Sequence, residues 1–395
     1  MKRVLIILPD FGFGGAEKSA AAVSRLLAQK YFVHFLVFNE RSQPAYPIGG
    51  NIHSLQVDGG GGFLNKVVAF ITRVYRARLL KGKLQIDVSI SFLEGADYVN
   101  FFSCRGEKLI CSIRGSKQHD PNIVGALGWL RHKILMPLVY SRVDAVVVVN
   151  PSIAQEMKKF YRVGEWRIVP IFNFYDITAL QGLASEPLGA DVEKELETRQ
   201  AIVAVGRLAP EKAFDHLISA FNLVKSRLNN AVLLLVGSGS ELEHLIVSAT
   251  KFGLTYQMGA SLPLADVCFV GYQKNPLKWV KRAKVFVLSS VIEGFPNVLL
   301  EAMAVGTPVL ATDCNYGPRE VLQTDNTFGL LMDVIATGTA IDHPSHGKWA
   351  DYIIRILTDE QKRNELITNG YQRASEFSEE KISPQWFQLI EKICP

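Results

Sequence analysis

Short runs of β-branched and other apolar residues alternate with longer helical stretches along almost the whole chain. The runs in the first half are apolar on both faces, as strands must be when helices cover both faces of their sheet. They are Val4–Leu8, Val33–Phe38, Val88–Phe92, Leu109–Ile113 and Ala145–Val149. Helical stretches such as Ala16–Gln29 and Leu64–Leu80 lie between them. Repeated strand–helix units of this kind predict a parallel, right-handed, doubly wound sheet.

A second series of the same kind begins near residue 201, after the polar and acidic stretch Ser185–Gln200. Its expected strands are Ile202–Val205, Val232–Val236, Val267–Phe269, Val285–Leu288 and Pro308–Ala311, and its expected helices Ala213–Leu228, Glu241–Phe252, Asn297–Ala304 and Trp349–Thr358. A chain of 395 residues also suggests two domains, because single cores rarely grow past ~250–300 residues. We therefore predict an α/β protein with two Rossmann-like domains, 1–175 and 201–376, joined by a linker at 176–200 and facing a central cleft.

Composition excludes several other classes of protein. A hydrophobic fraction of 48% and a charged fraction of 21% are ordinary for a soluble globular enzyme, which argues against a disordered chain, collagen or a disulfide scaffold. The net charge of +5 is unevenly placed: residues 1–150 hold 19 basic and 10 acidic side chains, and residues 151–395 hold 24 and 28. The basic first half predicts an anionic partner or surface, although no recognisable nucleic-acid-binding motif accompanies it.

The cysteines and the apolar runs indicate in which cellular compartment the protein works. Five scattered cysteines without a CxxC pair fit reduced thiols in a cytoplasmic protein better than a secreted framework or a zinc site. The apolar start of the chain is too short for a signal-peptide core, and no run approaches the ~18 residues that a membrane span needs. We expect any membrane contact to be peripheral.

A glycine loop, Gly12 to Lys18, follows the first expected strand and opens the first helix. Glycines let a ligand approach the backbone, and the N–H groups of a helix start favour an anion. The dinucleotide fingerprint would need glycine where Glu17 stands, although the acidic Glu40 after the second strand keeps NAD as a weak alternative. A purely structural turn explains the loop equally well.

Two further glycine turns lie in the second series. Gly206 and Arg207 follow a strand, and Lys212 comes five positions after Arg207, so a guanidinium and an ammonium flank one loop. Such cations suit a diphosphate and can stabilise its charge as it leaves, whereas two solvated loop charges are the alternative. The turn Gly237–Glu241 is only supporting evidence for a ligand site, since Ser240 is explained as the N-cap of the next helix.

The most informative segment runs from Ser289 to Ala304. A strand ends in a serine-rich turn that carries Glu293, Gly294 and Pro296 shape the entry to a helix, and Glu301 lies within that helix. The backbone of the turn favours an anion, and Glu301 could accept hydrogen bonds from a ribose diol. A solvated helix glutamate is the ordinary alternative, but Glu301 is surrounded by apolar neighbours.

Together these residues resemble glycosyltransferase family 4, the retaining nucleotide-sugar transferases with the two-domain B-type (GT-B) fold. The resemblance spans nearly the whole chain: Glu293-x7-Glu301 with Gly306-Thr307-Pro308-Val309 and Gly317-Pro318-Arg319-Glu320 is similar to the family's signature segment. Gly206-Arg207 with Glu211-Lys212 resembles its diphosphate loop, and Gly14-Gly15-Ala16-Glu17 its N-terminal glycine loop. The segment 377–395, with Phe377-Ser378 and Trp386, resembles the terminal helix that crosses back to the first domain.

The resemblance implies roles for individual residues. Arg207 and Lys212 would hold the two phosphates and stabilise the leaving nucleoside diphosphate, Glu293 would contact the transferred sugar, and Glu301 would bind the ribose hydroxyls. These three charged groups, Arg207, Lys212 and Glu293, are the expected catalytic residues. The expected donor-binding residues are Gly14, Gly15, Gly206, Arg207, Lys212, Glu293, Gly294, Phe295, Pro296, Asn297 and Glu301.

One position departs from the family. Many members carry a histidine after the fourth strand of the first domain, and here the strand Leu109–Ile113 runs into Arg114. Either Arg114 takes the histidine's place at the sugar or acceptor, or His119 is displaced toward it. A surface-loop role for His119 is the alternative.

The expected activity is transfer of a hexose or N-acetylhexosamine from a nucleotide sugar, with retention, to a glycan or lipid-linked acceptor. UDP is preferred over GDP because the segment Asn315–Glu320 resembles members that handle UDP-sugars. No Asp-x-Asp motif is present, so we expect neither a metal nor another cofactor. The alternatives are an epimerase or phosphorylase on the same fold, and a non-catalytic nucleotide-sugar sensor or scaffold.

A basic amphipathic stretch in the first domain indicates where a membrane could attach. Six cations punctuate it, namely Lys66, Arg73, Arg76, Arg78, Lys81 and Lys83, among the apolar residues Val67, Val68, Phe70, Ile71, Val74 and Tyr75. A second basic group, Arg131, His132 and Lys133, follows Trp129 and Leu130. Such surfaces suit anionic lipid headgroups, and a solvated helix that packs its apolar side on its own sheet is the alternative.

Overall fold

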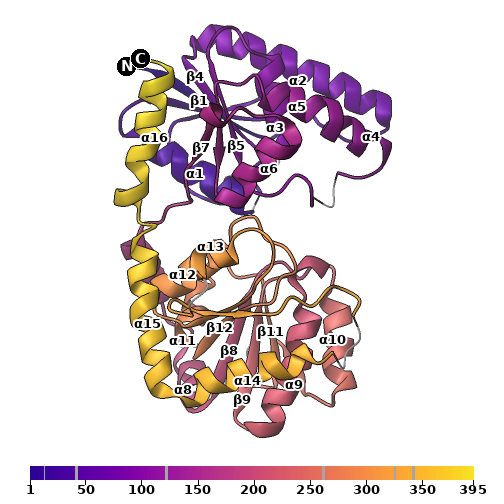
Figure 1. Cartoon of the computed structure of the whole chain (residues 1–395), viewed down its shortest axis with the longest axis vertical. Coiled ribbons are helices and arrows are strands. Elements are labelled where there is room, and N and C mark those ends of the chain that lie inside the picture. Colours follow the sequence, from indigo (N-terminus) through magenta and orange to yellow (C-terminus); the bar gives the residue numbers. More distant parts are fainter. Residues whose placement is uncertain (13, 41–42, 121–122, 260–262, 324–325, 340–342) are drawn as a thin grey trace. The chain divides into compact units, whose positions relative to one another are not determined.

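The chain forms two compact units (Figure 1). The computed structural model describes residues 1–395 except residue 13 and the segments 41–42, 121–122, 260–262, 324–325 and 340–342. The first unit consists of Met1–Phe174 together with Glu380–Pro395, and the second of Tyr175–Glu379.

The first unit is built on a seven-stranded parallel sheet with the order β3-β2-β1-β4-β5-β6-β7. The two central strands β1 and β4 are neighbours although β2 and β3 separate them in the sequence, so the chain winds outward in both directions. The strands are β1 Arg3–Leu8, β2 Phe32–Val37, β3 Asn51–Ser54, β4 Val88–Phe92, β5 Lys108–Ile113, β6 Ala145–Val148 and β7 Ile168–Pro170. This is the doubly wound arrangement that places ligands at the carboxyl edge of the strands.

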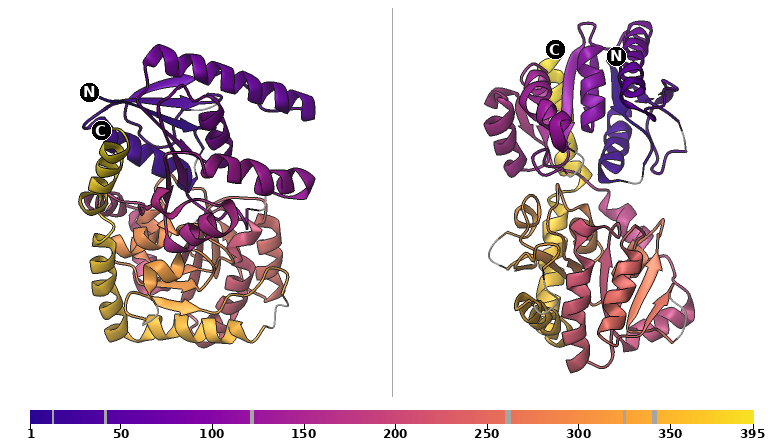
Figure 2. Two further views of the ribbon diagram at one scale, coloured as in Figure 1. Left: turned by 45° about the horizontal axis from the view of Figure 1, so that its top comes forward. Right: turned by 90° about the vertical axis from the view of Figure 1, so that its right-hand side faces the viewer.

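Helices cover both faces of this sheet, and Figure 2 gives two further views of them. They are α1 Gly15–Ala28, α2 Phe63–Leu84, α3 Glu94–Phe102, α4 Gly125–Leu130, the π-helix η1 Arg131–Leu135, α5 Met136–Tyr140, α6 Pro151–Tyr161, the short 3-10 helix η2 Glu165–Arg167 and α16 Glu379–Ile393. Alternate residues of β1 serve the two layers: Val4 and Ile6 share a core with α1 and α16, whereas Leu5 and Ile7 share one with α2 and α3. Burial on both faces explains why every position of this strand from Val4 onward is apolar.

The C-terminal helix α16 is part of the first unit. Trp386 and Ile390 are fully buried in the core that also contains Val4 and Ile6 of β1. The resemblance implied such a return of the chain, and the apolar spacing of α16 supplies its physical cause.

The second unit repeats the architecture with the strand order β10-β11-β9-β8-β12-β13-β14, all parallel. Its strands are β8 Gln200–Val205, β9 Ala231–Val236, β10 Tyr256–Met258, β11 Val267–Gly271, β12 Val285–Leu288, β13 Val309–Thr312 and β14 Leu330–Met332. Its helices are α7 Ile177–Ala184, α8 Ala190–Thr198, the 3-10 helix η3 Pro210–Lys212, α9 Phe214–Arg227, α10 Leu242–Lys251, α11 Leu277–Arg282, α12 Asn297–Ala304, α13 Pro318–Leu322, α14 Ser345–Thr358 and α15 Glu360–Ser375. The predicted fold, two Rossmann-like doubly wound sheets, is confirmed.

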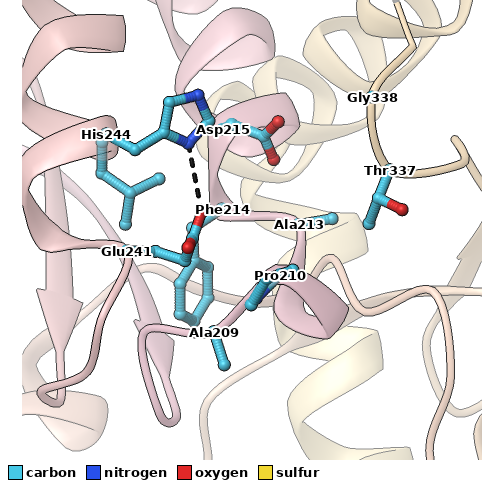
Figure 3. Close-up of a pocket in the computed structure, with 10 residues that line it drawn as sticks. Ala209, Pro210, Ala213, Phe214, Asp215, Glu241, His244, Thr337 and Gly338 are labelled. Carbon is cyan, nitrogen blue, oxygen red and sulfur yellow. Dashed lines mark ion pairs between the residues drawn. The ribbon is translucent and has the colours of Figure 1, made fainter. Parts of the chain in front are cut away.

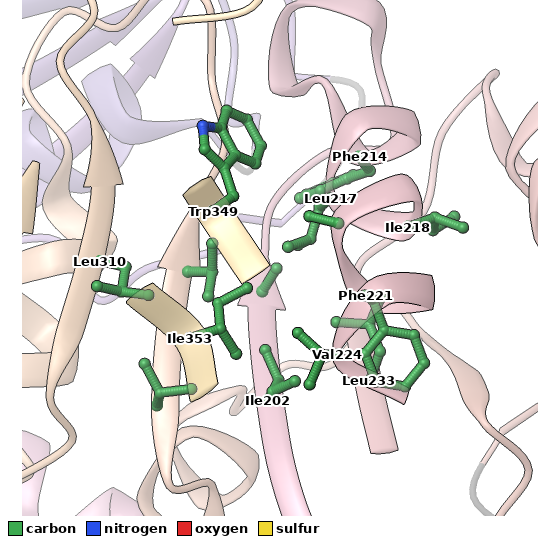
Figure 4. Close-up of a cluster of buried hydrophobic side chains, with 14 of the residues drawn as sticks. Ile202, Phe214, Leu217, Ile218, Phe221, Val224, Leu233, Leu310, Trp349 and Ile353 are labelled. Carbon is green, nitrogen blue, oxygen red and sulfur yellow. The ribbon is translucent and has the colours of Figure 1, made fainter. Parts of the chain in front are cut away.

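The core of the second unit forms between α9, α14 and the sheet (Figure 4). Phe221 on α9 and Ile202 on β8 share it with Trp349 of α14, and all three are fully buried. The Trp349 indole Nε1 donates a hydrogen bond to the Asp333 carbonyl over 3.0 Å, so this large side chain is buried with its polar atom satisfied.

The segment 176–200, expected to be a linker, is helical. It contains α7 and α8, and both belong to the second unit. Asp176 caps α7 by accepting a hydrogen bond from the Ala179 N–H over 2.8 Å. Glu193 of α8 forms an ion pair with Arg282 of α11. The acidic character that suggested a solvated linker therefore belongs to helix caps and ion pairs.

In the described part of the chain, none of the helices is long and apolar enough to cross a membrane.

Candidate functional site

Two glycine turns of the second unit support each other at the carboxyl edge of its sheet. The loop after β8 begins at Gly206, whose N–H donates to the Val236 carbonyl over 3.0 Å, and the loop after β9 begins at Gly237. A Cβ on Gly237, which has a φ of +151°, would lie 1.8 Å from the Gly206 carbonyl oxygen. The Leu208 N–H donates to the Ser238 carbonyl over 3.0 Å. The turn at 237–241 therefore holds in place the loop from Gly206 to Lys212, which is called the diphosphate-type loop below because of its resemblance to the family's diphosphate loop.

This close approach predicts a stability effect. We expect Gly237→Ala to lower the free energy of unfolding by about 1–3 kcal/mol more than Gly253→Ala, because the new methyl group would overlap backbone. Gly253 is a matched control, since it also has a positive φ (+72°) but a Cβ there would meet no described atom within 4 Å. Urea unfolding of both variants measures the difference, and equal losses would contradict the steric account.

Lys212 and Glu293 meet at this edge. The Lys212 Nζ lies 2.5 Å from Glu293 Oε1, and the Ser290 hydroxyl donates to the same oxygen over 2.6 Å. Both charged side chains are largely buried, with 20% and 11% of their surfaces exposed. The Ser289 hydroxyl donates to the Lys212 carbonyl over 2.6 Å, which ties the turn after β12 to η3. Lys212 and Glu293, the cation and the carboxylate that the sequence predicted at this site, thus form one ion pair.

Arg207 lies on the same loop but is far more exposed. Its guanidinium pairs with Glu211 over 2.5 Å, and 73% of its side chain is exposed. Burial of Glu211 opposes ionisation, but hydrogen bonds from the backbone and Arg207, together with the charges of Arg207 and Lys212, hold the pKa of this carboxyl below its usual range. An exposed pair of this kind contributes little to stability, so the Arg207 cation remains accessible to an anionic ligand.

The turn before α12 is used largely for internal packing. The Phe295 ring is buried against Phe377, with ring centroids 6.0 Å apart, and the Asn297 side-chain oxygen accepts a hydrogen bond from the Tyr175 hydroxyl over 2.5 Å. A Cβ on Gly317, whose φ is +109°, would lie 2.4 Å from Cδ of Pro296. Phe295, Pro296 and Asn297, which were predicted to bind the nucleotide-sugar donor, therefore position the turn in the structure. Glu293 and Gly294 precede them in the same turn.

Glu301 is a buried carboxylic acid on α12. Only 6% of the residue is exposed, and its neighbours Leu300 and Ala302 are fully buried or nearly so. The ordinary explanation of a solvated helix glutamate is therefore excluded. A buried acid needs polar partners, which is consistent with a positioned group rather than a surface charge.

A small pocket opens beside the diphosphate-type loop (Figure 3). Pro210, Phe214 and Thr337 help to line it, and the His244 imidazole lies 3.2 Å from Glu241 at its rim. Its volume of about 110 Å³ is well below the roughly 300–1,000 Å³ of pockets that hold drug-sized ligands. It is therefore too small to be the donor site.

Cys314 also lies near this edge, next to the charge of Glu293. Burial, reinforced by the charge of Glu293, raises the pKa of Cys314 to about 12, so this thiol is protonated at neutral pH. Among the residues with described positions, no group of three or more histidine, cysteine, aspartate or glutamate side chains is arranged to hold a metal ion.

In the first unit, the carboxylate of Glu17 lies over the N-terminal glycine loop to which this residue belongs. Gly14 is the N-cap of α1, and Gly15 is its first residue. A Cβ on Gly14 would lie 2.3 Å from Glu17 Oε2, so the Glu17 side chain lies directly over the loop. Burial raises the pKa of Glu17, and the nearby Asp10 adds to the rise. Phe13 of this loop lies outside the described residues.

The two candidates for the missing family histidine differ in placement. Arg114 directly follows β5, donates to the Asn173 side-chain oxygen over 2.8 Å, and lies 5.0 and 5.8 Å from the ring centroids of Phe92 and Trp386. His119 is exposed and lies 3.0 Å from the Ser116 hydroxyl through Nδ1. Arg114 is thus fixed at the edge of the sheet, whereas His119 lies on a surface loop.

A buried acid near this edge predicts a pH effect on stability. Burial raises the pKa of Asp97 to about 6 from its ordinary 3.8, although Lys117 and hydrogen bonds from Ser91 and Tyr140 oppose the rise. Between about pH 4 and 6 the folded state then binds more protons than the unfolded state, so stability falls as pH rises. We expect Asp97→Asn to flatten this slope in urea unfolding at several pH values. An unchanged slope would show that another group causes it.

The structure brings together the sequence-predicted residues Gly206, Lys212 and Glu293 within one unit, with Arg207 on the same loop. Gly14, Gly15, Arg114 and His119 lie in the other unit. Ser290 was not among the predicted site residues, although its hydroxyl orients Glu293. Its signal in the sequence was its place in the serine-rich turn that follows the strand Val285–Leu288.

Comparisons with known proteins point to one family of enzymes. The model for glycosyl transferases group 1 matches residues 190–373, and the model for glycosyltransferase family 4 matches residues 13–179. An uncharacterized glycosyltransferase of Methanocaldococcus jannaschii is 29% identical over 282 residues, which are 64% of each chain. A Campylobacter jejuni N-acetylgalactosamine-N,N'-diacetylbacillosaminyl-diphospho-undecaprenol 4-alpha-N-acetylgalactosaminyltransferase is 23% identical over 397 residues, covering 97% of this chain and 98% of its own.

Solved structures show the same fold. HepE of Anabaena, crystallised with UDP and glucose, matches with a TM-score of 0.76 and 17% identity over 99% of this chain and 100% of its own. Sucrose-phosphate synthase of Thermosynechococcus elongatus matches with a TM-score of 0.78 and 18% identity over 100% and 99%. With the two family models matching consecutive parts that cover most of the sequence, the chain belongs to the glycosyltransferases of the family 4 and group 1 type and has the GT-B fold.

Proposed function

We propose that this glycosyltransferase moves a hexose or N-acetylhexosamine from a nucleotide sugar to a glycan or lipid-linked acceptor, with retention at the anomeric carbon. The observation that carries the proposal is the Lys212 ammonium held at the carboxyl edge of the second sheet by Glu293 and Ser290. A positioned cation at this edge, with the exposed Arg207 on the same loop, suits the diphosphate of such a donor.

In the proposed reaction, the bond between the anomeric carbon and the diphosphate oxygen breaks, and the acceptor oxygen bonds to the same face of that carbon. The acceptor's hydroxyl proton passes to the departing nucleoside diphosphate. Lys212 and Arg207 stabilise the negative charge that develops on this leaving group, which is where fixed cations lower the barrier most. Glu293 contacts the transferred sugar, and Glu301 accepts hydrogen bonds from the ribose.

Related proteins support the choice of a UDP-sugar as donor and of a glycan or lipid-linked acceptor. The HepE crystals contain UDP with glucose or UDP-glucose, which favours UDP here over GDP, with GDP-mannose as the second donor to test. The Campylobacter transferase is named for a diphospho-undecaprenol-linked glycan, and other relatives are named for amylovoran and capsular polysaccharide synthesis. We therefore place the activity in the synthesis of cell-surface polysaccharide or glycolipid.

We propose further that the reaction needs neither a metal nor another cofactor, since Lys212 and Arg207 supply the positive charge that a bridging metal would bring. We also propose a cytoplasmic location with peripheral attachment to an anionic membrane face. The five cysteines are all free, which fits a reducing compartment.

The proposal is tested by product analysis. The protein is incubated in excess chelator with a UDP-sugar and a lipid-linked oligosaccharide, and the new glycosidic bond is examined by proton NMR. We expect an α-linked product from an α-linked donor. Release of free sugar without need of an acceptor would favour the epimerase alternative. Tight donor binding without any turnover would favour a sensor or scaffold.

A further inference from the structure

The chain passes between the two units at two places, and its segments at these places pair with each other. It enters the second unit at Tyr175 and leaves this unit after Glu379. The Tyr175 N–H donates to the Phe377 carbonyl over 3.0 Å, and the Glu379 N–H donates to the Tyr175 carbonyl over 2.9 Å. Tyr175 and the segment 377–379 therefore form a short parallel bridge, which is called the crossing pair below.

The crossing pair contacts the turn that leads from β12 into α12, residues 293–297, which is called the α12 turn below. Each of the two crossing segments supplies one side chain. The Tyr175 hydroxyl donates to the Asn297 side-chain oxygen over 2.5 Å, and the Phe377 ring centroid lies 6.0 Å from that of Phe295. Tyr175, Phe295 and Phe377 are buried, with between 3% and 6% of each residue exposed. Both crossing segments thus hold the α12 turn.

The helices next to the crossing pair in the sequence hold α12 itself. The Gln181 side-chain amide of α7, the helix that follows the first crossing, donates to the Ala304 carbonyl at the end of α12 over 3.1 Å. The helix α15, which precedes the second crossing, packs beside α12 (Figure 1). A Cβ on Gly370 of α15 would lie 3.5 Å from Cγ of Met303 of α12. The body of α12 is therefore fixed by contacts separate from those of its turn.

The other end of the α12 turn carries a charged group of the site. Glu293 begins the turn, and its carboxylate lies 2.5 Å from the Lys212 ammonium. Asn297 ends the turn and is bound by Tyr175, and Phe295 between them is buried. Close-packed segments of this kind move as connected pieces, so a shift of Asn297 displaces Glu293 relative to Lys212.

We propose that Tyr175 and Phe377 are positioning residues for glycosyl transfer, which act through the α12 turn on Glu293. Packing alone does not require the Tyr175 hydroxyl, since a phenylalanine ring would fill the same space without the directional hydrogen bond. Because α12 has its own contacts with α7 and α15, Glu301 stays in place without them. The contact of Glu293 with the transferred sugar rests on the proposed function, whereas the attachment of the α12 turn to the crossing pair does not.

Kinetics of Tyr175→Phe separate this role from nucleotide binding. We expect the turnover number with a UDP-sugar to fall about tenfold, since small displacements of a group at the reacting centre cost this much or more. The dissociation constant of UDP should stay within about twofold of the wild-type value, because UDP lacks the sugar that Glu293 contacts. Phe377→Leu keeps an apolar side chain but removes the ring against Phe295, and it should show the same split between turnover and UDP binding.

Tyr140→Phe is the matched control. It also removes a buried tyrosine hydroxyl, which donates to Asp97 over 3.0 Å in the first unit, and it should keep wild-type turnover and UDP affinity. Hydrogen exchange of the unliganded proteins adds a measurement that needs no donor. The amides of residues 293–297 should exchange about tenfold faster in Tyr175→Phe and at the wild-type rate in Tyr140→Phe, because only the first variant releases the turn.

Any of three results overturns the proposal. The first is wild-type turnover in Tyr175→Phe, or an equal loss of turnover in Tyr140→Phe. The second is a loss of UDP affinity as large as the loss of turnover, which would assign Tyr175 to nucleotide binding. The third is wild-type exchange of the α12 turn in unliganded Tyr175→Phe. A wild-type protein without transferase activity would count against the proposed function, and the exchange measurement would still decide whether Tyr175 fixes the turn.

Discussion

Replacing Lys212 by alanine should lower the turnover number by about 10²–10³-fold, the usual cost of removing one preorganised group that stabilises developing charge. The ammonium lies 2.5 Å from Glu293 and belongs to a loop fixed by Gly206 and Gly237. It is therefore positioned before any ligand arrives, and the variant leaves Glu293 without its cation. Initial rates of UDP-sugar consumption at saturating donor measure the effect.

The control for this variant is Lys348→Ala on α14. Lys348 also pairs with a carboxylate, Asp333, over 2.9 Å, but it is exposed and is not one of the predicted donor-binding residues. We expect its turnover to match the wild type. A Lys212→Ala protein that is folded and fully active would remove Lys212 from the catalytic group, and equal losses in both variants would indicate a general effect of charge.

Replacing Glu301 by glutamine should weaken donor binding by about 10- to 100-fold, because hydrogen bonds to a charged group are typically worth 1.5–3 kcal/mol. A carboxylate offers two acceptor oxygens to a ribose diol, whereas the amide offers one. Glu301 is buried, so its charge is not dispersed in water. Isothermal titration with UDP gives the dissociation constant.

Two measurements keep this second result interpretable. Glu243→Gln changes an exposed glutamate of α10 and should leave the dissociation constant unaltered. The melting temperature of Glu301→Gln without ligand reports any loss of fold. An unaltered dissociation constant in a stable Glu301→Gln protein would exclude this residue from the ribose site.

The central strands were predictable because burial on both faces leaves a clear pattern. β1, β8 and β12 are apolar at nearly every position, and β4 is fully buried with serines at two of its five positions. The observed bounds of these four strands differ from the predicted ones by two residues at most. The four strands that were missed, β3, β7, β10 and β14, are the outermost strands of the two sheets. Each has only three or four residues, and the first three are largely half-buried or exposed, so they lack the continuous apolar run.

The candidate site was predictable as a set of residues but not as a set of contacts. The spacing after β8 and β12 predicted charged groups at one edge, since parallel strands end together there. It could not predict that Phe295 packs on Phe377 or that Asn297 binds Tyr175, because these contacts join segments 82 and 122 positions apart. The burial of Lys81 by Glu107 could not be predicted for the same reason.

The most direct test of the account is thermal unfolding of the wild-type protein with UDP, GDP, ADP, CMP, NAD and common sugar conjugates, first in chelator and then with Mg²⁺. A ligand that binds only the folded state raises the melting temperature by mass action. We predict stabilisation by UDP and a UDP-sugar in chelator, a smaller effect of GDP, and loss of most of the UDP effect in Lys212→Ala. Stabilisation by NAD alone, or by none of these ligands, would contradict the assignment of a nucleotide-sugar donor.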